Sequence, residues 1–283
     1  MNSDQQVAEL FVVVYICIYI SIIFVCQVLY SCHERKKKQE QKWSIQGIDL
    51  IPGHPHLNAS MDSLVLAPKL LKWIEKVDLN QVVIRSMTIT DVNWFAASPT
   101  PTKLGFVKFA VDATDLTTKK KIASNVVVCR GDSVAILIIV QVIKPRTKPV
   151  EYVLLCEQMR VPSGKRRREI CAGMMDDNGD IASVVLKEVE EETQFKIKNK
   201  VDLVSLGSVY VSPGLLDEEI HLYSWTTQIT ETEFIRKQEQ VYGNAAEGEE
   251  IKLSFVPVSK FKNELLEMKD VKAECAFYRH YIQ

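Results

Sequence analysis

Residues 173–195 read GMMDDNGDIASVVLKEVEEETQF, and this stretch decides the interpretation of the chain. Asp180 is a favourable N-cap residue, so we expect a helix that begins there and contains the acidic string. On such a helix Glu188, Glu191 and Glu192 stand at positions i, i+3 and i+4 and share one face. Carboxylates crowded in this way suit Mg²⁺ or Mn²⁺, which can bridge to a phosphate. The alternative is an acidic helix face that is only solvated.

Strands are expected on both sides of this helix. The β-branched run 133–143 (SVAILIIVQVI) is typical of a buried strand, and with residues 150–158 it predicts a hairpin. A short helix is expected from Pro68. Residues 162–169 (PSGKRRRE) are predicted to form an exposed loop, with a phosphate-facing loop as the alternative. Further strands are expected over 104–110, 122–129, 203–211, 219–227 and 251–257, a helix over 259–281, and a loop or short helix over 231–240.

Residues 173–195 are similar to the signature of the Nudix hydrolase superfamily. In that signature a Gly, five residues, a Glu and seven residues precede Arg-Glu-hydrophobic-x-Glu-Glu-x-Gly-hydrophobic. Gly173 matches the first position and residues 187–195 fall on the later block. Gly179 stands where the first Glu is expected, and the neighbouring Asp180 can partly substitute for it. Lys187 replaces the Arg and lacks its planar fork. Gln194 replaces the final Gly, which in the family ends the helix with a positive φ.

Three further blocks resemble ADP-ribose and ADP-sugar pyrophosphatases, most closely the plant-type ADP-sugar diphosphatases. They are EQMR at 157–160, ICAGMMDDNGD at 170–180 and SPGLLDEE at 212–219. The resemblance implies an α/β fold, a Nudix-type α/β/α sandwich with a small N-terminal antiparallel β-sheet. It also implies a homodimer formed through that N-terminal sheet.

The resemblance implies a metal-dependent reaction at the acidic helix. Glu188 and Glu192 would ligate Mg²⁺ or Mn²⁺, with Glu191 as a further ligand or base and a backbone carbonyl near Ala172 or Gly173 completing the site. Glu218 corresponds to the residue that activates water, and Glu219 is the fallback. The metal would neutralise the diphosphate and a carboxylate would accept the proton of water.

The resemblance also implies the substrate, a nucleotide sugar such as ADP-ribose or ADP-glucose. Its products would be a nucleoside monophosphate and a sugar phosphate. Arg160 would hold a phosphate or the adenylate group by its planar fork, and Glu157 and Gly214 belong to the same substrate-binding blocks. Leu215 stands where the family loop has a second Gly, so the loop is expected to differ in geometry.

The N-terminal part of the chain predicts a membrane anchor. Residues 10–30 carry no charge and at about 1.5 Å per residue span a bilayer core. The basic run 35–38 follows, so the positive-inside rule places the remainder, including the catalytic domain, in the cytosol of a single-pass protein. We divide the chain into an anchor (1–33), a basic and polar linker (34–63), an N-terminal helix and β-sheet subdomain (64–131) and a Nudix hydrolase domain (132–283).

Composition excludes several other classes. With 35 basic and 36 acidic residues the net charge is −1, so a nucleic-acid partner is not expected. The seven cysteines have irregular spacing and form no CxxC or Cys/His cluster, which argues against a disulfide framework or a zinc site. The five histidines form no recognisable triad with Ser or Cys.

Two alternatives to an active enzyme stay open. The departures at Gly179, Lys187 and Gln194 are compatible with a catalytically impaired Nudix module that binds a nucleotide sugar or a protein partner at a membrane. A structural membrane protein whose acidic helix is only a solvated face is the second alternative.

Overall fold

The computed structural model describes Val25, Gln27 and residues 42–123, 125–175, 180–243 and 250–282. It divides into two units, residues 1–44 and 45–283. Most of the predicted anchor, the basic run 35–38 and Gly179 lie outside the described residues. Among the residues that are described, no helix has the length and apolarity needed to cross a membrane.

The larger sheet of the second unit is mixed. Its strand order is β10–β11–β6–β7–β13–β12, with β8 paired to β7 and β9 paired to β6. β11 runs parallel to β6, whereas the predicted β6–β7 hairpin is antiparallel. The strands are β6 (Ser133–Ile143), β7 (Val150–Arg160), β8 (Lys165–Glu169), β9 (Cys171–Met174), β10 (Val204–Tyr210), β11 (Glu219–Thr230), β12 (Val241–Tyr242) and β13 (Ile251–Pro257).

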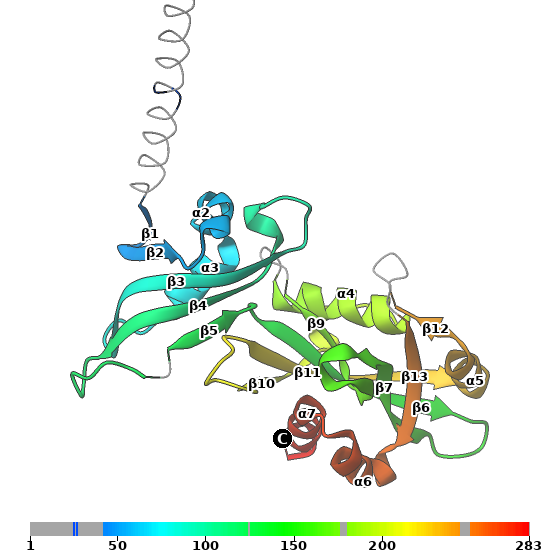
Figure 1. Cartoon of the computed structure of the whole chain (residues 1–283). Coiled ribbons are helices and arrows are strands. Elements are labelled where there is room, and N and C mark those ends of the chain that lie inside the picture. Colours follow the sequence, from blue (N-terminus) through cyan, green and yellow to red (C-terminus); the bar gives the residue numbers. More distant parts are fainter. Residues whose placement is uncertain are drawn as a thin grey trace, which may run out of the picture. The chain divides into compact units, whose positions relative to one another are not determined.

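Helices cover both faces of this sheet (Figure 1). Because side chains alternate along a strand, β6 contributes to two cores. Ile138 packs in the core that contains Val185 and Val189 of α4 (Ile181–Thr193). Leu137 packs in the core that contains Phe261 of α6 (Val258–Met268) and residues of α7 (Val271–Ile282). The chain therefore forms the predicted α/β/α layers, with α5 (Glu231–Glu239) following β11.

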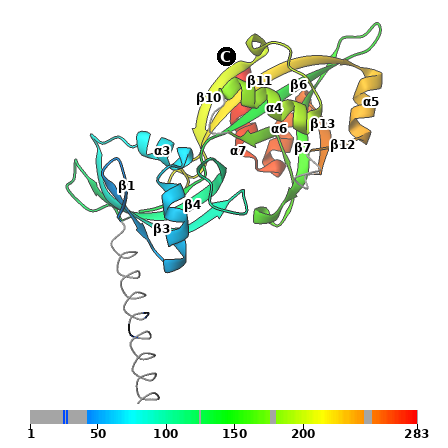
Figure 2. The same cartoon turned by 90° about the horizontal axis from the view of Figure 1, so that it is seen from above.

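The smaller sheet is mixed, so the prediction of an antiparallel N-terminal sheet is wrong in one pairing. β3 (Val82–Trp94), β4 (Leu104–Asp115) and β5 (Val126–Cys129) pair antiparallel, but β2 (Ile48–Pro52) runs parallel to β3. α3 (Pro68–Glu75) begins at Pro68 as predicted. It packs beside these strands (Figure 2), and the ring of Trp73 lies edge-on to that of Phe109 at 4.9 Å between centroids.

Three other expectations are corrected. The region predicted as an irregular linker contains β1 (Trp43–Ile45), β2 and α2 (Asn58–Leu64), because its alternating apolar residues are buried. The predicted loop PSGKRRRE ends in strand β8, where Arg168 forms an ion pair with Glu264 of α6 at 2.7 Å. Charged side chains are common on strands at sheet edges. The predicted C-terminal helix is two helices, separated at Lys269, which has a φ of 55°.

Candidate active site

The acidic helix α4 has well-defined ends. The Asp180 carboxylate accepts a hydrogen bond from the Ser183 backbone N–H at 3.1 Å, which confirms the predicted N-cap. The helix ends at Gln194, whose φ of 54° is the left-handed conformation that the family Gly adopts easily. Left-handed backbone costs a residue with a β-carbon about 1–2 kcal/mol. The substitution therefore preserves the helix end at some cost in stability.

Two of the three predicted glutamates lie against the backbone of β9. Glu188 is half-buried, and its carboxyl group lies so close to the Cα of Gly173 that a β-carbon there would overlap with it. Glu192 is 5% exposed, and its Oε2 accepts the Ala172 N–H at 3.3 Å. The sequence match at Gly173 is thus explained by space, since only glycine leaves room for the Glu188 carboxylate. Glu191 is exposed to solvent on the same helix.

The surroundings of Glu192 are of low polarity. The thiols of Cys156 and Cys171 are buried beside it. A hydrogen bond with Cys171 lowers the pKa of the Cys156 thiol, but burial and the Glu192 carboxylate raise it to about 11. The hydrogen bond with Cys156, burial and Glu192 raise the pKa of Cys171 well above its usual value. Both groups therefore stay neutral thiols at physiological pH next to a carboxylate.

The loop that carries Glu218 is fastened to the segment before β6. The Asp217 carboxylate accepts the Arg130 backbone N–H at 2.8 Å, the Gly131 N–H at 3.3 Å and the Cys129 thiol at 3.2 Å. Glu218 is 6% exposed. Its Oε2 lies 3.3 Å from Nη1 of Arg130, forming an ion pair. Within this loop the Leu215 N–H donates to the Ser212 carbonyl at 3.0 Å, and the expected difference from the family loop stays a prediction.

Arg130 also reaches β9. Its Nη2 lies 2.8 Å from Sδ of Met174, the residue after Gly173. Nearby, the Met175 backbone N–H donates to the Asp132 carbonyl at 2.9 Å. Arg130 and Asp132 therefore connect the Glu218 loop with the strand against which Glu188 and Glu192 lie.

Glu219 belongs to a second group of possible metal ligands. Ligand atoms of Asp132, Glu219 and His221 all lie within 4.8 Å of one another. A cation is already present there, because Lys76 Nζ lies 2.6 and 2.7 Å from the two Asp132 carboxylate oxygens. Glu219 accepts hydrogen bonds from the Ser208 and Tyr210 hydroxyl groups. A metal ion at this group would compete with the Lys76 ammonium, which disfavours it relative to the α4 glutamates.

The predicted substrate residues are placed in different surroundings. Arg160 uses its fork on Glu169, with Nε and Nη2 at 3.2 and 3.3 Å from the two carboxylate oxygens. Glu157 is half-buried on β7 opposite Arg168. Gly214 is exposed, and a β-carbon there would meet nothing within 4 Å. The role of each in substrate binding stays a prediction.

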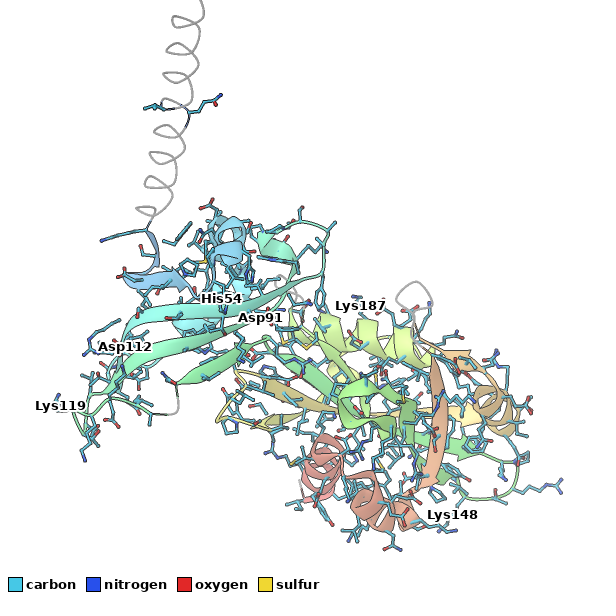
Figure 3. The ribbon with its side chains drawn as sticks, viewed as in Figure 1. His54, Asp91, Asp112, Lys119, Lys148 and Lys187 are labelled. Atoms are coloured by element: carbon cyan, nitrogen blue, oxygen red, sulfur yellow. The ribbon has the colours of Figure 1, made fainter. Side chains whose placement is uncertain are left out.

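Asp180 and Lys187 are the charged residues at or beside departures from the family signature, and both are exposed. Asp180 caps α4 and forms an ion pair with Lys200 at 2.7 Å. The hydrogen bonds from Lys200 and Ser183 hold the pKa of Asp180 well below its usual range. These contacts give Asp180 a structural role and no support as a replacement for the first Glu. Lys187 is exposed on the outer side of α4 (Figure 3).

A cavity of about 610 Å³ lies elsewhere in the domain, and none of the predicted site residues lines it. Its walls come from residues 196–204, from β6, from β11 and from α7. The candidate site is therefore defined by its side chains and not by this cavity.

The chain is similar in sequence to a Nudix hydrolase and to two bacterial proteins. It is 32% identical over 197 residues to Nudix hydrolase 14, chloroplastic, of Arabidopsis thaliana, covering 65% of this chain and 62% of that protein. Over 71 residues it is 38% identical to the methanol dehydrogenase activator of Bacillus methanolicus and 31% identical to the ADP-ribose pyrophosphatase of Bacillus subtilis. Each of these matches covers 25% of this chain and 37% of the relative. No protein-family model matches the chain.

Among solved structures, a crystal structure of an ADP compounds hydrolase matches at 13% identity, covering 70% of this chain and 94% of that one. Its TM-score of 0.42 is too low to support an argument. The sequence relatives confirm the resemblance predicted from residues 173–195, since the chain is similar in sequence to a Nudix hydrolase and to an ADP-ribose pyrophosphatase. The matched region spans less than two thirds of the length of each of these relatives.

Proposed function

We propose that this protein is a metal-dependent pyrophosphohydrolase that cleaves nucleoside diphosphate sugars such as ADP-ribose or ADP-glucose. The products would be a nucleoside monophosphate and a sugar phosphate. The observation that carries the proposal is the close fit of the Glu188 carboxylate onto Gly173, with Glu192 bonded to the neighbouring Ala172 N–H. This packing places the carboxylates of α4 against the backbone of β9, where the glycine leaves space for the Glu188 carboxylate.

The donor set fits a hard divalent cation. Glu188 and Glu192 offer carboxylate oxygens, and β9 adds backbone carbonyls, which are the ligand types preferred by Mg²⁺ and Mn²⁺. When bound, the cation would neutralise charge on the diphosphate and help to orient water. Glu191, being exposed, is available as a further ligand. Asp132, Glu219 and His221 are the alternative group.

Glu218 is the proposed proton acceptor, with Glu219 and Glu191 as fallbacks. Glu218 is held by the Asp217 anchor and is paired with Arg130. A carboxylate acts as a base only when it is within hydrogen-bond reach of water. Glu219 is engaged by two hydroxyl groups, which makes it the less available of the two adjacent carboxylates.

One relative and the shared sequence blocks support the proposed substrate class. The Bacillus subtilis relative is an ADP-ribose pyrophosphatase. Arg160, Glu157 and Gly214 are proposed to contribute to the substrate site. A hydrolysis screen over ADP-ribose, ADP-glucose, UDP-glucose and NADH tests this, and equal rates on all four would contradict an ADP-sugar preference.

The decisive experiment is release of AMP from ADP-ribose by the full-length chain, purified in mild detergent, with and without Mg²⁺. A Glu192→Gln variant is the matched control, because it keeps the shape of the side chain and removes its charge. The proposal predicts Mg²⁺-dependent turnover that the variant loses by about a hundredfold or more. Wild-type turnover no higher than that of the variant would refute it.

That negative result would favour the second candidate, an impaired Nudix module that binds a nucleotide sugar or a protein partner. The burial of Glu218 under Arg130 and the exposed Lys187 in place of the family Arg support this candidate. It predicts saturable binding of ADP-ribose without AMP release. Failure to bind ADP-ribose would argue against the nucleotide-sugar version of it.

Membrane attachment and assembly are separate proposals. We propose a single membrane span within residues 10–30, with the catalytic domain in the cytosol, on the basis of the uncharged run and the basic residues after it. Protease protection in sealed vesicles tests the orientation, and protection of the C-terminal domain would contradict it. We also propose a homodimer, by analogy with related enzymes. A monomeric mass in sedimentation at micromolar concentration would overturn it.

A further inference from the structure

Arg130 occupies a position between the two halves of the candidate site. One nitrogen of its guanidinium pairs with Glu218 on the loop before β11, and another contacts Met174 on β9. Met174 follows Gly173, the residue against which the Glu188 carboxylate lies. The guanidinium therefore contacts the residue that follows this glycine on β9 and pairs with the carboxylate proposed to accept a proton.

The two members of the ion pair differ in exposure. The Arg130 side chain is 42% exposed, whereas that of Glu218 is 7% exposed. A guanidinium has five N–H donors, and the contacts with Glu218 and Met174 use only part of them. The exposed side of Arg130 can accept an anion from solvent, while Glu218 is shielded beneath it.

The charge of the site explains why an arginine is needed. Glu188, Glu191, Glu192 and Glu218 make it strongly acidic, and an anionic diphosphate would be repelled without fixed positive charge. Lys76 is bonded to both carboxylate oxygens of Asp132, so it is less suited to this task than Arg130. A planar guanidinium also matches two phosphate oxygens at once.

We propose that Arg130 is a substrate-binding residue that holds the diphosphate, and that it exchanges its ion pair with Glu218 for a phosphate when the nucleotide sugar binds. The exchange would release Glu218 to contact water only when substrate is present. This inference rests on the proposed function for the identity of the ligand. It adds a residue that lies outside the sequence blocks shared with ADP-sugar pyrophosphatases. This residue would couple substrate binding to the availability of Glu218 as the base.

Binding of ADP-ribose in EDTA tests the inference without turnover. Isothermal titration of the full-length chain compares wild type with Arg130→Ala and Arg130→Lys. The control is Arg146→Ala, which removes an arginine far from the candidate site. Arg146 follows β6 and Arg130 precedes it, so the two residues lie at opposite ends of that strand. Loss of a bidentate charge-assisted contact is expected to weaken binding about ten- to hundredfold in Arg130→Ala. Arg130→Lys should recover only part of the loss, and Arg146→Ala should bind as wild type does.

Arg130→Ala leaves Glu218 buried without its partner, and this variant risks misfolding. The double variant Arg130→Ala/Glu218→Gln removes the orphaned charge and should fold normally yet bind ADP-ribose as weakly as Arg130→Ala. Glu218→Gln alone should bind at least as tightly as wild type, because Arg130 is then free, while its turnover falls. Weak binding by Glu218→Gln would contradict the exchange.

The outcomes separate this inference from the proposed function. Wild-type binding of ADP-ribose that weakens in the Arg130 variants supports the inference even if no hydrolysis occurs with Mg²⁺. Hydrolysis by wild type together with unchanged binding and an unchanged KM in Arg130→Ala overturns the inference and leaves the proposed function standing. Absence of ADP-ribose binding by wild type overturns it as well.

Discussion

Gly173→Ala is the perturbation that probes the candidate site most sharply. The added β-carbon would overlap with the carboxyl carbon and both oxygens of Glu188, and Glu188 must therefore move by an ångström or more. Because the atoms that it meets are the far end of a flexible, half-buried side chain, the cost in stability should stay near the lower end of the range for overpacking, about 1 kcal/mol. A displacement of about 1 Å at a catalytic group lowers the rate roughly a hundredfold. The same small change should therefore reduce both stability and Mg²⁺-dependent hydrolysis.

A double-mutant cycle assigns the effect to this one contact. Urea denaturation is measured for wild type, Gly173→Ala, Glu188→Ala and the double variant. Because Glu188→Ala removes the carboxyl group that the new methyl group would strike, Gly173→Ala should cost much less in that background. A coupling free energy of about 1 kcal/mol or more is expected for residues in direct contact.

Additive effects in this cycle would refute the geometry. So would a Gly173→Ala variant that is as stable and as active as wild type. Either result would mean that the Glu188 carboxylate does not lie on Gly173, and the link between the glycine of the signature and the metal ligands would have to be abandoned.

Three further results are expected. Gln194→Gly should raise the free energy of unfolding by roughly 1 kcal/mol in urea denaturation, because glycine adopts the left-handed conformation of this position without the strain of a β-carbon. A variant that is less stable than wild type would contradict this. Arg160→Ala should lower stability by about 1 kcal/mol and leave the KM for ADP-ribose little changed, because the Arg160 guanidinium is paired with Glu169. A large rise in KM without a loss of stability would support the predicted role of Arg160 in substrate binding. Burial raises the pKa of Glu169, but Lys272 and Arg160 outweigh burial and lower that pKa below its usual 4.5. Wild type should therefore be more stable than Glu169→Gln above pH 4.5, and the difference in stability should shrink as the pH falls further. A difference that does not depend on pH would argue against the ion pairs.

Features that depend on neighbouring residues could be predicted from the sequence. The Asp180 cap, the span of β6 and the hairpin with β7 are local, because they follow from residue type and hydrophobic periodicity. The family signature assigned Glu188 and Gly173 to one metal site, but the contact between them is visible only in the structure.

Features that depend on long-range pairing could not be predicted in this way. β6 and β11 run parallel with Ser133 opposite Ile220, which places the segments before the two strands side by side. That pairing brings Arg130 and Asp132 to Glu218 and Glu219, although each lies more than 80 residues away in the chain. The only signal in the sequence was a pair of charged residues directly before a buried strand, which by itself is typical of a solvated loop.

The central claim is that the glutamates of α4, and not the Asp132–Glu219–His221 group, hold the divalent cation. Electron paramagnetic resonance of Mn²⁺ titrated into the full-length chain measures this directly for wild type, Glu192→Gln and His221→Ala. We expect a bound Mn²⁺ in wild type and in His221→Ala, with binding weakened at least tenfold in Glu192→Gln. Unchanged Mn²⁺ binding in Glu192→Gln, with loss of binding in His221→Ala, would contradict the account.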